Sequence, residues 1–155
     1  MTPAINILKK AKCTFQVHEY SHDPQHASFG LEAVEKLGLP AEQVFKTLVV
    51  KLDNGQLAVA VLPVNKLLSM KAIAHVLQAK KAEMADKQQV QRSSGYVLGG
   101  VSPLGQKKSL PTVIDDSAQT LQSMFVSGGR RGLEIELSPV LLATLTNALF
   151  ASIAQ

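Results

Sequence analysis

The sequence contains no tryptophan, one cysteine and few aromatic residues, and each of these shortages narrows what the protein can be. Because Cys13 has no second cysteine to pair with, an internal disulfide is excluded, and this agrees with a reducing compartment. Aromatic residues make up 5% of the chain, too few for a broad surface on which nucleic-acid bases stack. No apolar run approaches the roughly 20 residues of a membrane span, and residues 1–12 lack the apolar core of a signal peptide. We therefore expect a cytoplasmic protein with neither a membrane nor DNA as its partner.

The residues that are present favour a globular protein with a polyanionic partner. The chain has 155 residues, of which 46% are hydrophobic and 18% charged, so we expect one domain spanning 1–155. The formal net charge is +4, which suits a nucleic acid without requiring one. The basic residues are either candidate phosphate contacts or parts of an ordinary solvated surface, and the candidates are Lys9, Lys10, Lys80, Lys81, Lys107, Lys108, Arg130 and Arg131.

The order of periodic segments predicts a mixed α/β (α+β) protein. Apolar residues at helical spacing, preceded by capping residues, predict helices that begin near residues 3, 31, 70, 87 and 140. The second of these helices presents Leu31, Val34 and Leu37 as its apolar stripe. Strands are predicted at 14–20, 48–52, 56–62, 112–114, 123–126 and 133–138, and a tight turn at 53–55 joins the second strand to the third. Because strands and helices do not alternate strictly, a mixed sheet or barrel with peripheral helices is expected.

Two stretches stand out as candidate sites. Residues 93–111 form a glycine-rich loop that includes Gly99 and Gly100, and bare peptide N–H groups of this kind can bind a carbonyl oxygen or an anion. The alternative interpretation of this loop is a hairpin with loose connections. Lys46 lies where the strongly apolar strand begins, an unusual place for a lysine unless its stem reaches along the strand to the surface.

Metal and nucleophile chemistry find little support in the sequence. His18, His22 and His26 recur every four residues, but Pro24 interrupts any helix that would align them, so solvated loop histidines are favoured over a zinc site. Phe29, at the end of that loop, is either a core residue or a pocket wall. No common catalytic set of nucleophile and base is visible, so a hydrolase of this sequence would use water or a group of its substrate. We expect neither a metal nor a cofactor.

Five separated segments, taken together, carry a resemblance to a known family. They are MTPAINILKK at 1–10, VFKTLVV at 44–50, KAEMAD at 81–86, GYVLGGVSPLGQKK at 95–108 and VSGGRRGLEIEL at 126–137. In this order they resemble the YbaK/EbsC family, which is related to the editing domain of bacterial prolyl-tRNA synthetase, over essentially the whole chain. Within that family the chain is most similar to the branch that deacylates Cys-tRNA(Pro). The resemblance implies a mostly antiparallel, β-barrel-like core surrounded by helices, and a hydrolase of mischarged tRNA.

The resemblance also implies a site and a mechanism. Lys46 and Thr47 match the family's F/Y-K-T motif, whose lysine would hold the aminoacyl group or the terminal adenosine. Gly99 and Gly100 match pocket glycines whose amides could bind the ester carbonyl. The other positions that match pocket residues are Tyr20, Phe29, Ser127 and Glu134. The thiol of the substrate would attack the ester and release a thiolactone, a step of lyase type, which would then open.

One position departs from the family pattern, and it affects the choice of substrate. Closely similar members carry Asp where this chain has Glu134, and the extra methylene shifts a contact or shrinks the pocket. The leading hypothesis is a trans-editing deacylase of Cys-tRNA(Pro), with Cys-tRNA(Cys) as a further substrate. Since no module for reading tRNA sequence is recognisable, prolyl-tRNA synthetase is the expected partner. The alternatives are water-driven editing of Ala- or Ser-charged tRNA, a non-catalytic module that binds nucleotides or the tRNA CCA end, and a structural accessory of a synthetase.

Overall fold

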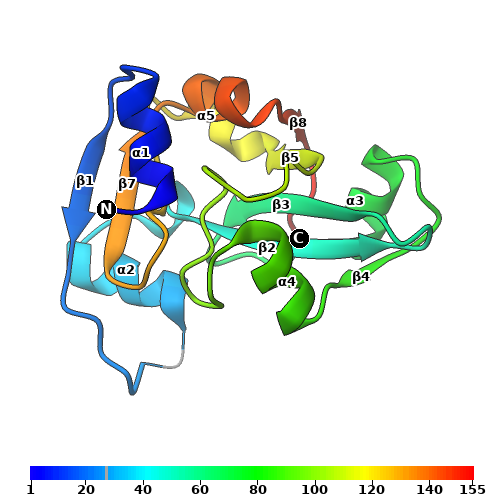
Figure 1. The fold of residues 1–155 in the computed structure, drawn as a ribbon, viewed down its shortest axis with the longest axis horizontal. Coiled ribbons are helices and arrows are strands. Elements are labelled where there is room, and N and C mark those ends of the chain that lie inside the picture. Colours follow the sequence, from blue (N-terminus) through cyan, green and yellow to red (C-terminus); the bar gives the residue numbers. More distant parts are fainter. Residues whose placement is uncertain (27) are drawn as a thin grey trace.

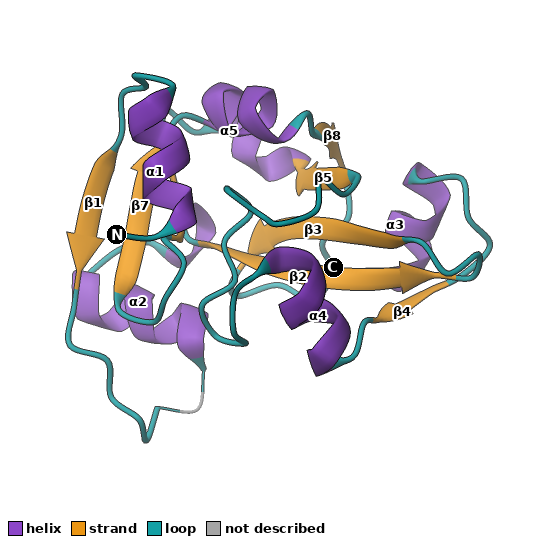
Figure 2. Ribbon diagram, in the orientation of Figure 1, coloured by secondary structure: helices purple, strands orange, loops and turns teal. Residues whose placement is uncertain are grey.

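A computed structural model describes residues 1–26 and 28–155, and its strands form two sheets (Figure 1). In spatial order, the smaller sheet contains β1 (Gln16–Glu19), β7 (Leu133–Leu137) and β6 (Met124–Ser127). The larger sheet contains β4 (Ala82–Met84), β2 (Phe45–Leu52), β3 (Leu57–Pro63), β5 (Thr112–Asp115) and β8 (Leu149–Ala151). Five α-helices and two short 3-10 helices cover the sheets (Figure 2), namely α1 (Pro3–Lys10), α2 (Phe29–Leu37), η1 (Ala41–Gln43), α3 (Met70–Val76), α4 (Lys87–Ser94), η2 (Asp116–Thr120) and α5 (Pro139–Thr146).

The β2–β3 hairpin is the centre of the larger sheet. Its strands pair in antiparallel register from Phe45 opposite Pro63 to Lys51 opposite Leu57. Gly55 closes the turn with a φ of +88°, a conformation that glycine adopts without a steric penalty. Every residue of β3 except the first is buried, because the strand has packed side chains on both faces. The hairpin expected at 48–52 and 56–62 is therefore confirmed.

Strand directions confirm a mixed, mostly antiparallel fold. β2 pairs antiparallel with β3 and β4, and β7 does so with β1 and β6, whereas β5 pairs in parallel with β3 and β8. The two sheets meet where Val44, just before β2, forms an isolated parallel bridge with Phe125 of β6. Within the described residues the strands do not close into a complete barrel, so the expected barrel-like core is a pair of sheets joined along one side.

Capping residues determine where the helices begin, as the sequence predicted. The side chains of Thr2, Ser69 and Asp86 each accept a hydrogen bond from the backbone N–H three residues later. α1 and α5 bury Leu8 and Leu142 in the largest core cluster, which lies against strands of both sheets. α3 packs on a second cluster at the other face of the larger sheet, together with residues from the end of the chain.

Helix α2 confirms its predicted apolar stripe in part, since Val34 packs against a core cluster whereas Leu31 does not. The side chain of Leu31 is 38% exposed, whereas Glu32 is 1% exposed and Ala33 is fully buried. The prediction that Leu31 belongs to the buried stripe was wrong. Glu32 occupies the buried position instead, because its carboxylate accepts hydrogen bonds from the loop that precedes the helix.

The first residues of the chain pack between two glycine loops. The Thr2 hydroxyl donates a hydrogen bond to the Gly128 carbonyl. A Cβ placed on Gly105 would lie 2.7 Å from the carbonyl carbon of Pro3, and one on Gly129 would lie 3.0 Å from Thr2 Cβ. Both glycines have positive φ, +68° and +111°, so each is required for its backbone shape as well as for the close approach.

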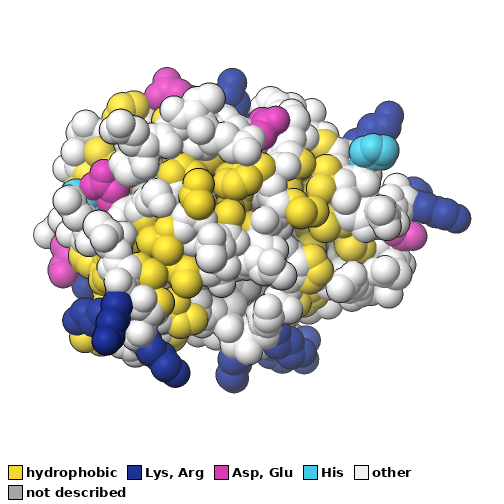
Figure 3. All heavy atoms as spheres, turned by 90° about the horizontal axis from the view of Figure 1, so that it is seen from above, with side chains coloured by type: hydrophobic (Ala, Val, Ile, Leu, Met, Phe, Trp, Pro, Cys, Tyr) yellow, Lys and Arg dark blue, Asp and Glu magenta, His cyan; other side chains and the backbone are white. Residues whose placement is uncertain are grey.

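Charge is distributed around the edge of the molecule. Figure 3 shows Lys and Arg side chains projecting from the periphery of one face, while hydrophobic side chains lie across its centre. Among the residues described, none of the helices combines the length and hydrophobicity that crossing a bilayer requires.

Candidate active site

A cavity of about 370 Å³ opens where the two sheets meet. Its wall is built from the end of β1, the start of α2, the start of β2, the glycine loop and the turn between β6 and β7. Of the eight residues expected at the site, the cavity brings together Tyr20, Lys46, Thr47, Gly99, Ser127 and Glu134. The remaining lining residues are Ser28, Gly30, Phe45, Leu48, Leu98, Val101, Arg130 and Arg131.

Lys46 lies at the cavity wall and does not project freely into solvent. It is partly buried near the start of β2, opposite Leu62 of β3, and its Nζ donates a 2.5 Å hydrogen bond to the Lys66 carbonyl. Burial lowers the pKa of the Lys46 ammonium from 10.5. The hydrogen bond holds the side chain in a fixed direction, and Lys46 and Gly99 both line the cavity.

Thr47, the next residue of β2, contributes a hydroxyl without a partner. Its Oγ1 is buried, and no hydrogen bond reaches it from the described part of the chain. A buried hydroxyl without a hydrogen bond is costly, by about 1–3 kcal/mol in proteins. Since Thr47 lines the cavity, a bound ligand is the natural source of the missing hydrogen bond.

Glu134 is the acidic residue of the cavity, and it is almost entirely enclosed. It lies on β7 between His18 of β1 and Ser127 of β6, and it is 7% exposed. Burial raises its pKa from 4.5 to about 8, so the protonated form is favoured at pH 7. Burial, followed by the charge of Glu134, raises the pKa of neighbouring Tyr20 to about 12. Glu134 and Tyr20 are thus largely uncharged at neutral pH.

The two pocket glycines have different structural roles. Gly99 lines the cavity with a φ of +91°, and no hydrogen bond from its N–H to another described residue occurs. The Gly100 N–H instead donates to the Val97 carbonyl at 3.0 Å, and Gly100 is not part of the cavity lining. A Cβ on Gly100 would lie 2.8 Å from Arg130 Cα, so this glycine lets the two loops approach each other. Of the two amides expected to face a ligand, the structure leaves Gly99 as the candidate.

The remaining two expected residues differ in what can be said of them. Ser127, at the end of β6, lines the cavity, and its Oγ accepts a 3.2 Å hydrogen bond from the Gly129 N–H. Phe29 is the first residue of α2, but its side chain lies outside the part of the chain that the structure describes. Its assignment as a pocket wall stays a prediction.

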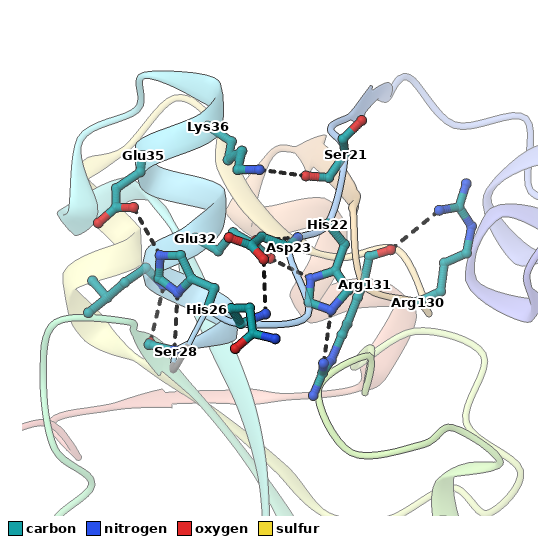
Figure 4. A network of polar contacts seen from close by, with 12 residues as sticks. Ser21, His22, Asp23, His26, Ser28, Glu32, Glu35, Lys36, Arg130 and Arg131 are labelled. Carbon is teal, nitrogen blue, oxygen red and sulfur yellow. Dashed lines mark hydrogen bonds and ion pairs between the residues drawn. The ribbon is translucent and has the colours of Figure 1, made fainter.

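A polar network beside the cavity was not predicted from the sequence (Figure 4). Arg131 lines the cavity and contacts His22, which in turn contacts the buried Glu32 of α2. The glycine-rich turn carrying Arg131 was noticed as basic, but its partners are more than 90 residues away in the sequence. The one sign of this network in the sequence was Glu32, a glutamate with apolar residues on both sides of it in a predicted helix.

Each of the three regularly spaced histidines has its own glutamate. The distances from imidazole nitrogen to carboxylate oxygen are 3.0 Å for His18–Glu136, 2.7 Å for His22–Glu32 and 2.9 Å for His26–Glu35. The expectation of solvated loop histidines was therefore wrong, since these contacts orient the rings. In the described residues, no group of three His, Cys, Asp or Glu side chains is arranged to hold a metal ion.

The fold and the cavity belong to a known class of proteins. Residues 24–145 match the family described as "Aminoacyl-tRNA editing domain", and the chain is a member of that family. This confirms the resemblance that the five sequence segments carry. The family consists of proteins that edit aminoacyl-tRNA, so the class of activity is aminoacyl-tRNA deacylation.

Individual relatives agree with this assignment. The protein named "Putative Cys-tRNA(Pro)/Cys-tRNA(Cys) deacylase EbsC" from Enterococcus faecalis is 36% identical over 152 residues, covering 98% of this chain and 92% of that protein. A "Proline--tRNA ligase" from Geobacter metallireducens is 28% identical over 123 residues, which are 75% of this chain and 21% of the ligase. The solved structure entitled "Crystal structure of a putative trans-editing enzyme for prolyl tRNA synthetase" shares the fold, with a TM-score of 0.85, 19% identity, and coverage of 100% of this chain and 98% of that one.

Proposed function

We propose that this protein removes cysteine from mischarged Cys-tRNA(Pro), and also from Cys-tRNA(Cys), by letting the cysteine thiol cut its own ester. The observation that carries the proposal is the cavity itself. Both Lys46 and Gly99 line it, and its described lining contains no cysteine and no histidine. The lining hydroxyls therefore lack an adjacent imidazole base that would activate them as nucleophiles. The protein supplies position and carbonyl polarisation, and the substrate supplies the nucleophile.

The steps follow from this division of labour. The thiolate sulfur bonds to the ester carbonyl carbon, and the electron pair of the C=O bond moves onto the oxygen. Lys46 Nζ and the Gly99 N–H donate hydrogen bonds to this developing oxyanion. The tetrahedral intermediate then breaks its bond to the ribose oxygen, which takes up the proton that the thiol lost. Water opens the released thiolactone to give free cysteine.

Thr47 and Glu134 are proposed to hold the amino group of the substrate. The Thr47 hydroxyl has no partner among the described residues, and the Glu134 carboxyl has no charged partner that would favour its ionised form. A substrate ammonium group beside Glu134 would stabilise the carboxylate, so binding would release the proton of Glu134. The side chain that departs from the family pattern is thereby assigned to substrate recognition.

The tRNA itself is proposed to be delivered by a synthetase. The cavity has room for an aminoacyl-adenosine end, and no element of the described chain resembles a module that reads anticodon bases. Association with prolyl-tRNA synthetase would supply this selection, and the similarity to prolyl-tRNA ligases supports the idea.

The decisive experiment compares tRNA(Pro) charged with cysteine, serine, alanine or S-methylcysteine. Loss of labelled amino acid from the tRNA is measured, and the thiolactone is trapped and identified by mass spectrometry. We expect the cysteine ester to react at least about a hundredfold faster than the others, because they lack an intramolecular thiol. Equal rates for serine and cysteine would instead establish attack by water. If no ester is lost although tRNA binds, the protein is a binding module.

A further inference from the structure

Three side chains form a continuous row from the buried face of α2 to the cavity wall (Figure 4). Glu32 Oε1 lies 2.7 Å from His22 Nδ1, and His22 Nε2 lies 2.9 Å from the Arg131 NH1 nitrogen. The second carboxylate oxygen of Glu32 accepts a 2.8 Å hydrogen bond from the Asp23 N–H. Lys36, one turn further along α2, donates to the Ser21 carbonyl and fastens the same loop.

The proton positions in this row follow from the chemistry of its ends. A guanidinium can only donate hydrogen bonds, so His22 Nε2 must accept the one from Arg131. The imidazole therefore carries its proton on Nδ1 and donates it to the Glu32 carboxylate. Burial opposes the ionised form of Glu32, but the hydrogen bonds from His22 and Asp23 outweigh it and lower the pKa of Glu32 from 4.5. The row fixes the plane in which the guanidinium lies.

The charge of the cavity indicates what this guanidinium is for. Lys46, Arg130 and Arg131 line the cavity, whereas its acidic residue, Glu134, is largely uncharged at neutral pH. An aminoacyl ester contains no anion, whereas three of the described lining residues are cations and one is an acid, so the cavity favours a ligand that also carries negative charge. The nearest anion in an aminoacyl-tRNA is the phosphodiester on the 5′ side of its terminal adenosine. A planar guanidinium binds phosphate oxygens in pairs, which makes arginine well suited to this contact.

We propose that Arg131 binds this phosphodiester, and that His22 and Glu32 are the positioning residues that hold Arg131 in place. The neighbouring Arg130 is a poorer candidate, because its side chain is 54% exposed and its contact with Glu19 is a solvated 3.5 Å ion pair. The inference rests on the proposed function for the identity of the ligand. Phosphate binding can nevertheless be measured without any deacylation.

The first test compares the binding of adenosine and adenosine 5′-monophosphate by isothermal titration calorimetry. We expect the monophosphate to bind about tenfold more tightly, as one charge-assisted contact predicts. Arg131→Gln and His22→Leu should remove this preference. His22→Gln should retain most of it, because a carboxamide can donate to Glu32 and accept from Arg131. Lys71→Gln, an exposed change on α3, is the matched charge control and should retain all of it.

The second test separates a positioning role from a merely structural one. With Cys-tRNA(Pro), Arg131→Gln and His22→Leu should raise KM about tenfold and leave kcat nearly unchanged. With 3′-O-cysteinyl adenosine, which has no phosphate, the same variants should match the unmodified protein. The slope of log(kcat/KM) against log salt should fall by about 0.7 in both variants, as expected for one lost phosphate contact on a single strand.

The outcomes distinguish this inference from the proposed function. If adenosine and its monophosphate bind equally to the unmodified protein, the inference is overturned even when deacylation is observed. It is also overturned if Arg131→Gln keeps the preference for the monophosphate. If no ester is hydrolysed but the preference is present and lost in both variants, the proposed function fails and the phosphate site stands. Urea unfolding of each variant identifies any loss that comes from destabilised protein.

Discussion

Two glutamates, one in the lining of the cavity and one beside it, are buried to a similar degree and behave in opposite ways. Glu32 on α2 is 1% exposed, and its pKa is lowered because both carboxylate oxygens accept hydrogen bonds that outweigh the effect of burial. Glu134 on β7 is 7% exposed, and burial without a charged partner raises its pKa to about 8. Burial alone therefore does not decide whether an acid is charged, since the hydrogen bonds that replace water do.

The contrast separates a structural acid from a ligand-binding one. The partners of Glu32 come from the protein, so its contribution to stability is complete before any ligand arrives. Glu134 lines the cavity, and burial is the one cause that shifts its pKa, so we expect a substrate cation to be the partner of its carboxylate. The predictions that follow test this division, beginning with the largest expected effect.

The largest effect is expected from Lys46→Ala, which tests whether the cavity binds and activates the ligand. We expect kcat/KM for Cys-tRNA(Pro) to fall by about 10²–10³, the usual result of removing one donor to a developing oxyanion. The free energy of unfolding should change by less than about 1 kcal/mol, because among the described residues the ammonium bonds to a single exposed carbonyl. Deacylation and urea unfolding are measured on the same preparations, with Lys71→Ala as the control. Unaltered turnover in Lys46→Ala would remove Lys46 from the mechanism.

On the structural side, Glu32→Ala is expected to lower the free energy of unfolding by about 3 kcal/mol at pH 7. The change leaves the His22 ring and the Asp23 N–H without their acceptor, which is itself fully enclosed, and it leaves a void where the Glu32 side chain packs. Glu134→Gln, the matching change in the cavity lining, should cost less than about 1 kcal/mol, because it replaces a largely neutral acid by a neutral amide. Equal losses in the two variants would show that Glu134 is also a structural acid.

The pH dependence of stability should have opposite signs for the two acids. The pKa of Glu134 rises from 4.5 in the unfolded chain to about 8 on folding, so the folded state binds the extra proton between these values. Its contribution is fully present below pH 4.5 and is lost as the pH rises to 8, by up to about 1.4 kcal/mol per pH unit. The pKa of Glu32 is lowered, so its contribution is present above pH 4.5 and is lost as the pH falls. Urea unfolding at pH 5.5, 6.5 and 7.5 should show a decline in the unmodified protein that is shallower in Glu134→Gln.

The smallest effect concerns the methylene by which this chain departs from the family pattern. Glu134→Asp shortens the side chain and enlarges the base of the cavity. We expect the ratio of kcat/KM for cysteine to that for alanine to change by about tenfold, the usual value of one methylene in a pocket. The panel of charged tRNAs measures the ratio directly. A ratio that stays constant would mean that Glu134 does not contact the amino acid.

What the sequence predicted well depended on short-range patterns. The β2–β3 hairpin was visible because Asp53, Asn54 and Gly55 lie between two apolar runs, and the helix starts because capping residues precede them. Lys46 and Gly99 were recognised through a family resemblance, and the structure places them on one cavity. Each of these signals extends over a few consecutive residues, so it can be recognised in the sequence before the fold is known.

What the sequence did not predict depends on contacts between distant segments. β8 has only three residues, and its parallel pairing with β5 comes from the fold and not from a local pattern. Glu32 could not be distinguished from a surface glutamate, because its partners His22 and Arg131 are positioned by other elements. The role of Gly100 could be assigned only from the structure, because it is the close approach of the Arg130 backbone that excludes a side chain at this position.

The first residues of the chain pack between two glycine loops and thereby connect segments that are distant in the sequence. Thr2 bonds to Gly128, immediately before the turn that carries both arginines, and Pro3 abuts Gly105 in the loop that follows Gly99. Thr2 and Pro3 therefore brace the two glycine loops from outside, although neither residue lines the cavity. A change of both residues would release both loops at once, and with them the cavity lining that these loops carry.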